Sequence, residues 1–269
     1  MATIIESISN YYLKMENYAD PRVKNWFFMS TPIPTILLVI VYNVGVLSIG
    51  PRIMAKRKPL ELKTAIMLYN IGQILLNSFF VFQCFRLLWF SGDPVRFTCM
   101  EVDYSDTPLG RARAGSVWLF FMSRLFDLVD TVFFVLRKKQ SQVTFLHVYH
   151  HTVVALFGWM GTKFVPGGHG VFFGTINSFV HVVMYSYYSL ALINPEYKNA
   201  WWKKYLTQMQ MIQFVAIGLH AVAALFNPNC NYPKSLIMLA LPQNIFMFVL
   251  FADFYRKTYI KPMDKTKKA

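Results

Sequence analysis

The sequence predicts an all-α, polytopic membrane protein with seven transmembrane helices. Hydrophobic residues make up 55% of the 269 residues and charged residues only 15%, a composition outside the usual range of soluble domains. Several apolar runs reach the roughly 20 residues that a helix needs to cross a bilayer. Short basic clusters separate these runs, as expected for loops between membrane spans.

Each span has a boundary that can be read from the chain. Pro34 opens the first span and Pro51 closes it, while a Pro-Gly-Gly turn at 166–168 separates the fourth from the fifth. Pro195 and Pro228 end the fifth and sixth. The expected spans are 33–50, 64–90, 115–136, 144–164, 169–193, 205–226 and 235–257.

These spans form one membrane-embedded domain, 1–269, whose orientation follows from its basic residues. Loops on the side of the C-terminus carry 17 Lys and Arg, and those on the other side carry 8. The positive-inside rule therefore predicts that segment 1–31 is lumenal and that tail 258–269 is cytosolic. This distribution explains the net charge of +14 without a nucleic-acid partner.

Two further features fit that orientation. The chain ends KTKKA, where Lys265 and Lys267 resemble the cytosolic K-x-K-x-x signal that retains proteins in the endoplasmic reticulum. A multi-pass protein of that membrane is expected. Cys99 and Cys230 fall in lumenal loops, where a disulfide persists, so the sequence leaves open a bond between them or two free thiols. Cys84 lies within the second span.

Polar side chains gather in the cytosolic half of five spans. At about 1.5 Å per residue their depths overlap, and ionisable groups in hydrocarbon are costly enough to be functional candidates. We expect a polar chamber open to the cytosol above an apolar blind end, which suits a ligand with a polar head and a long tail. The residues are Asn70, Gln73, Asn77, Arg124, Asp127, Asp130, Thr131, His147, His150, His151, Asn177, His181, Tyr185, Tyr188, Thr207, Gln210 and Gln213.

The histidines at 147, 150 and 151 share one helix face. This pattern is compatible with three kinds of site. H-x-x-H-H is a histidine box of membrane di-iron desaturases and hydroxylases, but those enzymes need further boxes and this chain has six histidines in all. A zinc site is the second alternative. The third is acyl transfer, in which a neutral imidazole is the nucleophile. We expect no metal and no cofactor.

Four ordered motifs make the chain resemble the ELO family of very-long-chain fatty acid elongases over nearly its whole length. They are RLFDLVDT at 124–131, LRKKxSQVTFLHVYHH at 136–151, NSFVHVVMYSYY at 177–188 and WWKKYLTxxQxxQ at 201–213. The branch that it most resembles contains elongases seven and one. The ELO pattern for the first motif is K-x-x-E-x-x-D-T, so this chain has Arg124 for Lys and Asp127 for Glu.

The resemblance implies a 3-oxoacyl-CoA synthase, an acyltransferase that condenses a long-chain acyl-CoA with malonyl-CoA and releases carbon dioxide and CoA. It also implies that spans two to seven form a helical barrel around an acyl tunnel closed at the lumenal end. We expect a ping-pong reaction in which His150 carries the acyl group as an acyl-imidazole. His181 and Asn177 would polarise the thioester or stabilise the enolate. His147 and His151 would orient His150, Asp130 would hold an imidazole tautomer, and Asp127 is the second carboxylate of the expected site.

CoA phosphates call for basic side chains at the cytosolic face, although the positive-inside bias explains the same charges. The expected CoA and acyl contacts are Arg137, Lys138, Lys139, Lys203, Lys204, Tyr185, Tyr188, Gln210, Gln213 and Arg256. Expected partners are the lipid bilayer, the reductases and dehydratase of the elongation cycle, and, left open, a second copy of the chain. A seven-helix lipid receptor or carrier is the remaining alternative.

Overall fold

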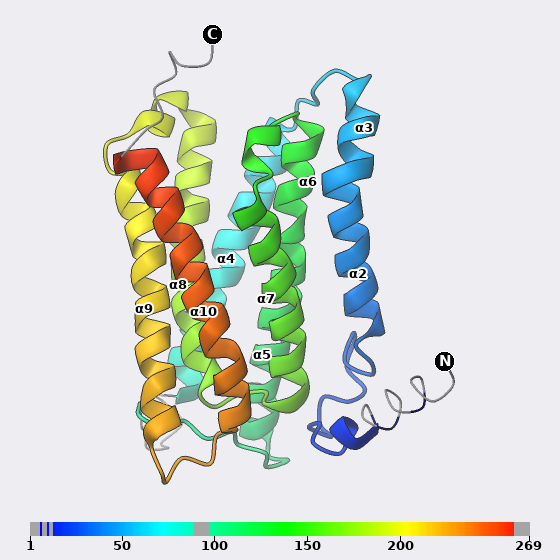
Figure 1. Cartoon of the computed structure of the whole chain (residues 1–269), viewed down its shortest axis with the longest axis vertical. Coiled ribbons are helices and arrows are strands. Elements are labelled where there is room, and N and C mark those ends of the chain that lie inside the picture. Colours follow the sequence, from blue (N-terminus) through cyan, green and yellow to red (C-terminus); the bar gives the residue numbers. More distant parts are fainter. Residues whose placement is uncertain (1–5, 7–9, 11–12, 89–96, 261–269) are drawn as a thin grey trace.

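The computed structural model describes residues 6, 10, 13–88 and 97–260. All regular structure in those ranges is helical. Long helices run roughly antiparallel between two ends of the molecule (Figure 1). Their bounds are α2 Ile33–Val44, α3 Gly50–Ala55, α4 Lys63–Leu88, α5 Pro108–Phe126, α6 Leu128–Leu136, α7 Phe145–Phe164, α8 Gly170–Ile193, α9 Lys203–Phe226 and α10 Lys234–Tyr255. Short π- or 3-10-helical segments are η1 Gly45–Ile49, η2 Gln140–Gln142, η3 Pro195–Asn199 and η4 Arg256–Ile260.

Five of the helical segments are long and apolar enough to cross a membrane: Ile33–Ala55, Lys63–Leu87, Gly170–Ile193, Lys203–Phe226 and Lys234–Ile260. This confirms a helical, multi-pass membrane protein at the coarse level. The other two expected spans are helical but differ in detail. The third begins at Pro108, not at 115, and is divided at Asp127 into α5 and α6. The fourth, α7, contains three histidines and Lys163, which lower its hydropathy.

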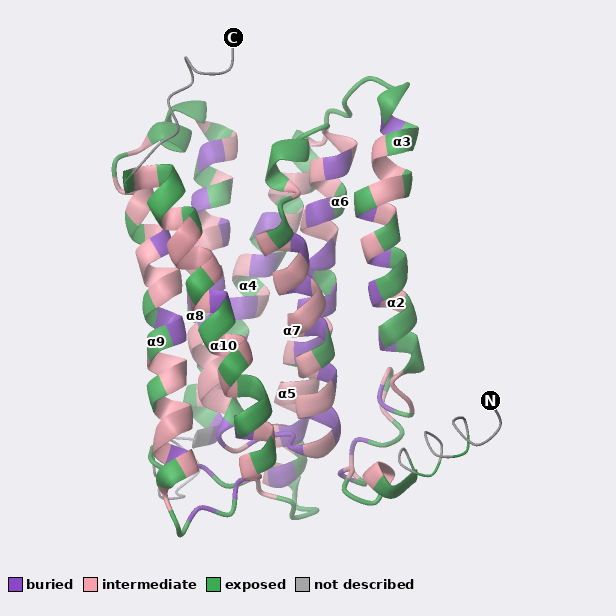
Figure 2. Cartoon of the chain, viewed as in Figure 1, coloured by how far each residue is buried: buried purple, intermediate pink, exposed green. Residues whose placement is uncertain are grey.

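The longer helices pack as a ring. Neighbouring contacts run from α4 to α5, α7, α10, α9 and α8, and α8 packs extensively against α4 to complete the circuit. α2 lies outside this ring against α7 (Figure 1). Buried residues lie mainly on faces turned towards other helices, and exposed ones on outer faces (Figure 2).

Many of the exposed residues are large and apolar. Leu37 on α2, Leu68 and Leu75 on α4, and Ile212 and Leu219 on α9 are each more than half exposed. A soluble monomer rarely exposes so much contiguous apolar surface. The outer face therefore suits contact with lipid chains.

The segment before α2 docks onto one end of α5 and α7. Trp118 Nε1 donates to the Phe27 carbonyl at 3.0 Å, and Trp159 Nε1 to the Phe28 carbonyl at 2.8 Å. Lys163, which is fully buried, donates to the Met29 carbonyl at 2.9 Å and pairs with Glu16 at 3.1 Å. These partners explain how a lysine near the end of α7 is accommodated without solvent.

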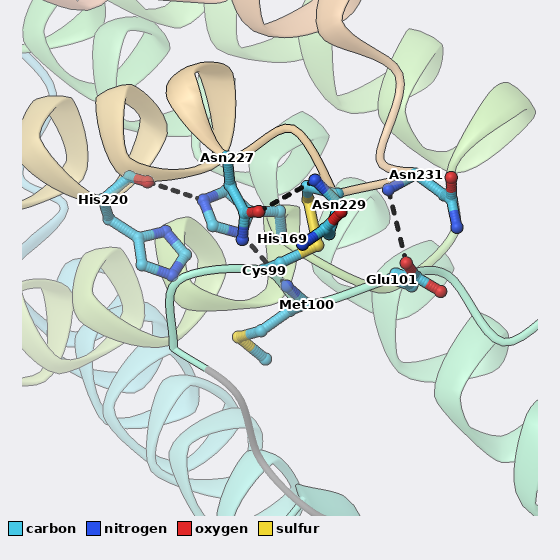
Figure 3. The surroundings of a disulfide bond; sticks show 9 residues. Cys99, Met100, Glu101, His169, His220, Asn227, Asn229 and Asn231 are labelled. Carbon is cyan, nitrogen blue, oxygen red and sulfur yellow. Dashed lines mark hydrogen bonds between the residues drawn. A yellow bond between two sulfur atoms is a disulfide. The ribbon is translucent and has the colours of Figure 1, made fainter.

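A disulfide joins Cys99 to Cys230 at the same end of the bundle, across 131 residues of sequence (Figure 3). Beside it, His169 Nε2 lies 2.7 Å from the His220 carbonyl, and the two imidazoles stack with centroids 3.6 Å apart. The bond ties the segment before α5 to the loop between α9 and α10. It is the bond that the sequence left open between these two cysteines.

Candidate active site

Arg124 is the centre of a buried polar cluster, and its side chain is 1% exposed. The guanidinium donates to Asn77 Oδ1 on α4 at 2.6 Å and to Asn177 Oδ1 on α8 at 3.0 Å. It also lies 2.8 Å from His181 Nδ1 and 3.1 Å from Asp127 Oδ2. One cation therefore holds side chains from three helices, as the planar fork of arginine allows.

The two aspartates meet at Tyr185, not at the histidine box. The Tyr185 hydroxyl lies 2.7 Å from Asp130 Oδ2 and 3.2 Å from Asp127 Oδ1. We expected Asp130 to hold an imidazole, but it contacts Tyr185 instead. The carboxylate next to an imidazole is that of Asp127, whose Oδ2 lies 3.6 Å from His181 Nδ1. The cause is local: the helix turns at Asp127, and Asp130 is directed to α8 instead of α7.

The histidine box begins within the first turn of α7. Thr144 caps this helix, and its side-chain oxygen accepts from the backbone N–H of His147 at 3.3 Å. His147 Nε2 lies 2.8 Å from the hydroxyl of Thr131, which in turn lies 2.8 Å from the Tyr42 hydroxyl. Thr131 and Tyr42 could not be predicted as partners of the box, because α2, α6 and α7 meet only in the fold.

The three box imidazoles lie in a row. The ring centroid of His147 is 4.4 Å from that of His151, and His151 is 5.3 Å from His150. His151 is buried between the other two, at 7% exposure. The spacing brings the rings together, as the sequence predicted. Of the three, His150 lies in the wall of a cavity between α7, α8, α9 and α10.

That cavity has a volume of about 240 Å³. His150 and Asn177 are polar residues in its wall, and most other lining side chains are apolar, including Val154, Phe157 and Phe214. It extends along α7, α8, α9 and α10 to Tyr232 and Leu236, close to the disulfide. From His150 to Gly161, which also lines it, α7 advances ~16 Å at 1.5 Å per residue.

Asn177 connects the cavity to the cluster. Arginine can only donate, so the Asn177 oxygen is used by Arg124. The Asn177 amide nitrogen is therefore the atom that can donate a hydrogen bond to a ligand in the cavity. His181, one turn further along α8, is not among the lining residues; it packs against Arg124 and Asp127 instead.

The expected CoA contacts lie at the ends of helices and not in the cavity wall. Arg137, Lys138 and Lys139 follow α6, Lys203 and Lys204 open α9, and Arg256 follows α10. These ends lie at the same end of the bundle (Figure 1). Their contacts are with other protein groups: Lys138 Nζ donates to the Ala55 carbonyl at 3.3 Å, Lys203 Nζ to the Lys198 carbonyl at 3.4 Å, and Arg256 pairs with Asp253 at 3.0 Å.

The remaining expected residues are spread around the cluster. The ring of Tyr188 packs on Tyr185 with centroids 5.9 Å apart. Gln210 Nε2 lies 3.8 Å from Met184 Sδ, and the buried Gln213 Oε1 has no hydrogen-bond partner among the described residues. Lys265 and Lys267 lie outside the described residues.

No three His, Cys, Asp or Glu side chains in the described ranges come together in an arrangement that could hold a metal ion. The importance of Arg124 and Asn77 to the site could not be predicted from the sequence. Both are visible there as polar residues within spans, but nothing in their spacing indicates that one cation joins α4, α5 and α8.

A cavity with mostly apolar walls lies inside a membrane-spanning helical bundle, with His150 near one end and His169 and His220 near the other. This defines a membrane protein suited to a ligand with a long apolar chain. The comparisons with known proteins give the particular family. Residues 27–267 match the ELO, or GNS1/SUR4, family, and the chain belongs to that family.

Several curated relatives support this assignment. A very long chain fatty acid elongase of Aedes aegypti is 42% identical over 96% of this chain and 72% of its own. Very long chain fatty acid elongase 7 of Rattus norvegicus is 42% identical over 90% of this chain and 86% of its own. Very long chain fatty acid elongase 1 of Mus musculus is 39% identical over 96% and 92%, respectively.

Proposed function

We propose that this protein is the condensing enzyme of fatty acid elongation. It joins a long-chain acyl-CoA to malonyl-CoA and yields a 3-oxoacyl-CoA two carbons longer, carbon dioxide and free CoA. Membership of the elongase family supports the reaction. The observation that supports the site is that His150 and Asn177 line the same apolar cavity.

The proposed reaction has two half-steps. The neutral His150 imidazole attacks the thioester carbonyl, the carbon–sulfur bond breaks, and CoA leaves as the thiol with the imidazole proton. Malonyl-CoA then loses carbon dioxide, and its carbon–carbon bond electrons form an enolate. The enolate carbon attacks the acyl-imidazole carbonyl, the carbon–nitrogen bond breaks, and the departing imidazolate takes up one proton from solvent, which regenerates neutral His150.

The neighbours of His150 have distinct proposed roles. The Asn177 amide nitrogen donates to the thioester oxygen as it becomes negative, and Arg124 fixes the amide in that orientation. His181 and Asp127 extend the same network. His147 and His151 position His150, with Thr131 bonded to His147.

The membrane arrangement is also a proposal. Seven helical segments cross the endoplasmic reticulum membrane as one domain, 1–269. They are α2 with α3, α4, α5 with α6, α7, α8, α9 and α10. The ring of spans two to seven surrounds an acyl tunnel. Segment 1–31 and the disulfide face the lumen, and tail 258–269 faces the cytosol. The basic helix ends bind CoA phosphates there, the reaction uses no cofactor, and the reductases and dehydratase of the cycle act on the product.

Microsomes that contain the expressed chain test the reaction. With labelled malonyl-CoA and acyl-CoA primers from C16 to C24, label is expected in products two carbons longer, and His150→Ala is expected to abolish it. Absence of incorporation with every primer would favour the receptor or carrier alternative. Metal analysis of active, purified protein tests the hydroxylase or desaturase alternative. That alternative requires bound iron or zinc.

A further inference from the structure

A second and larger cavity, of about 520 Å³, adjoins the first at the disulfide end of the bundle. Its inner part is lined by Phe80 and Cys84 of α4, Val117 of α5, and Gly174 of α8. Charged and amide side chains line another part, namely Glu101, Asp103, Arg113, Asn227 and Asn229. The proposed mechanism makes no use of this space.

The two cavities have a common wall, because four residues line both: Val117, Phe120, Gly167 and Gly170. Phe120 has the largest side chain of the four. Its ring packs edge-on against Phe173, which lines only the first cavity, and against Phe80, which lines only the second, with centroids 6.0 Å apart in both pairs. The Phe120 ring therefore stands between the two spaces.

We propose that the second cavity is a subsite for the methyl end of acyl chains too long for the first cavity, and that Phe120 sets that length limit. This inference rests on the proposed function. Burial of each additional methylene group is favourable, so a chain end is stabilised in the apolar inner part once the Phe120 ring is absent. The part of the second cavity that is lined by charged and amide side chains is not suited to the methyl end of an acyl chain.

Phe120→Ala tests the wall directly. The variant is expected to extend a saturated primer panel by at least one more two-carbon cycle than the parent protein does. Phe79→Ala is the matched control: it removes a phenyl ring from α4 that lines neither cavity and is expected to leave product length unchanged. An unchanged product profile in Phe120→Ala, or the same shift in both variants, would overturn the proposal.

Total rate is not the readout, because Phe120 also touches the active site. The Arg124 guanidinium lies over the Phe120 ring at 4.8 Å from its centroid, a favourable cation–π contact. Phe120→Leu, which keeps an apolar but shorter side chain, replaces the alanine variant if that variant does not accumulate. A smaller shift in the same direction is expected from it.

A second change should reverse the first. Gly174 lines only the second cavity, and a Cβ placed there would lie 3.8 Å from the Phe120 ring without a clash. Gly174→Leu in the Phe120→Ala background fills the space from the α8 side. The parental product length is expected to return, and continued synthesis of the longer products would contradict the proposal.

Cys84 gives a readout that does not depend on catalysis. It is the free thiol of the three cysteines, because Cys99 and Cys230 are bonded, and it lines the second cavity. A non-reacting thioether analogue of a C24 acyl-CoA is expected to slow maleimide labelling of Cys84 several-fold in Phe120→Ala, and a C16 analogue is not. Equal labelling rates with both analogues would count against the subsite. Failure of the parent protein to condense any primer would instead contradict the proposed function.

Discussion

Arg124 and Asp127 form a buried ion pair at 3.1 Å, and both side chains are almost inaccessible to solvent. The ELO pattern has Lys and Glu at these two positions. Arginine reaches further than lysine, and aspartate is one methylene shorter than glutamate, so the two differences compensate in length. This explains how the chain keeps a cation close to Asn177 and His181 with a different pair of residues.

Arg124→Lys and Asp127→Glu are therefore expected to be coupled. Each single change leaves a buried charge or a hydrogen-bond acceptor poorly paired, at a cost of about 2 kcal/mol in the free energy of unfolding. The double variant is expected to lose at least ~1 kcal/mol less free energy of unfolding than the two single variants lose together. Thermal denaturation in detergent measures all four corners of the cycle, and strictly additive losses would contradict the length argument.

The histidine box shows how far single residues could be predicted. Its i, i+3, i+4 spacing correctly predicted neighbouring imidazoles, because that relation is local to one helix. The partners of the box could not be predicted in this way. Thr131 reaches His147, and Tyr185 reaches Asp130, only because separate helices pack together.

At the scale of elements, the turn at Asp127 has the largest effect on the site. The sequence there contains neither proline nor glycine, so 115–136 was expected to be one continuous span. In the structure α5 ends at Phe126 and α6 begins at Leu128. The Phe126 carbonyl accepts from the Tyr69 hydroxyl at 3.2 Å, a tertiary contact that no local pattern reveals.

The turn between α7 and α8 was, by contrast, marked by Pro166, Gly167 and Gly168. Gly168 has φ +58°, and a Cβ there would lie 2.8 Å from the Met100 carbonyl oxygen and 2.9 Å from the Val102 nitrogen. Backbone from the disulfide-linked segment thus packs directly on this glycine. A side chain would require both segments to move.

Gly168→Ala is expected to lower the free energy of unfolding by about 2 kcal/mol, from left-handed backbone strain and the close contact. Gly72→Ala is the control, since a Cβ at that helical position meets nothing within 4 Å and alanine favours the helix. The thermal midpoints of the two variants give the comparison. Equal midpoints would show that the turn tolerates a side chain.

At the scale of the whole molecule, hydropathy was enough to predict a helical membrane protein and most helix boundaries. It does not determine the order of the helices in the ring, because many arrangements bury the same polar faces and expose the same apolar ones. The contact of α4 with α8, far apart in sequence, closes the ring and brings Asn77 to Arg124. The position of the second cavity follows from the same contact.

The disulfide provides a test of the proposed orientation. If Cys99 and Cys230 face the lumen, a membrane-impermeant reductant added to sealed microsomes should leave the bond intact, and the same reductant after detergent should break it. Maleimide mass-tagging of the reduced and unreduced chain in a Cys84→Ser variant reports the bond directly. Reduction in sealed vesicles would place these loops in the cytosol and contradict the orientation.

Breaking that bond should also weaken the fold. It closes a loop across 131 residues, for which chain entropy gives a stabilisation of ~4–5 kcal/mol as an upper value. A lower thermal midpoint is expected on reduction, with no reductant effect in a Cys99→Ser, Cys230→Ser variant. An unchanged midpoint in the parent protein would show that helix packing alone holds the disulfide end together.

The proposed reaction depends on His150 as the nucleophile at the head of an acyl-binding cavity, and one measurement tests this role most directly. Purified protein is incubated with a long-chain acyl-CoA in the absence of malonyl-CoA, and its peptides are examined by mass spectrometry. An acyl adduct is expected on the peptide that contains residues 145–151, at His150, absent from His150→Ala and discharged when malonyl-CoA is added. An adduct that survives in His150→Ala, or condensation by that variant at the parental rate, would contradict the central claim.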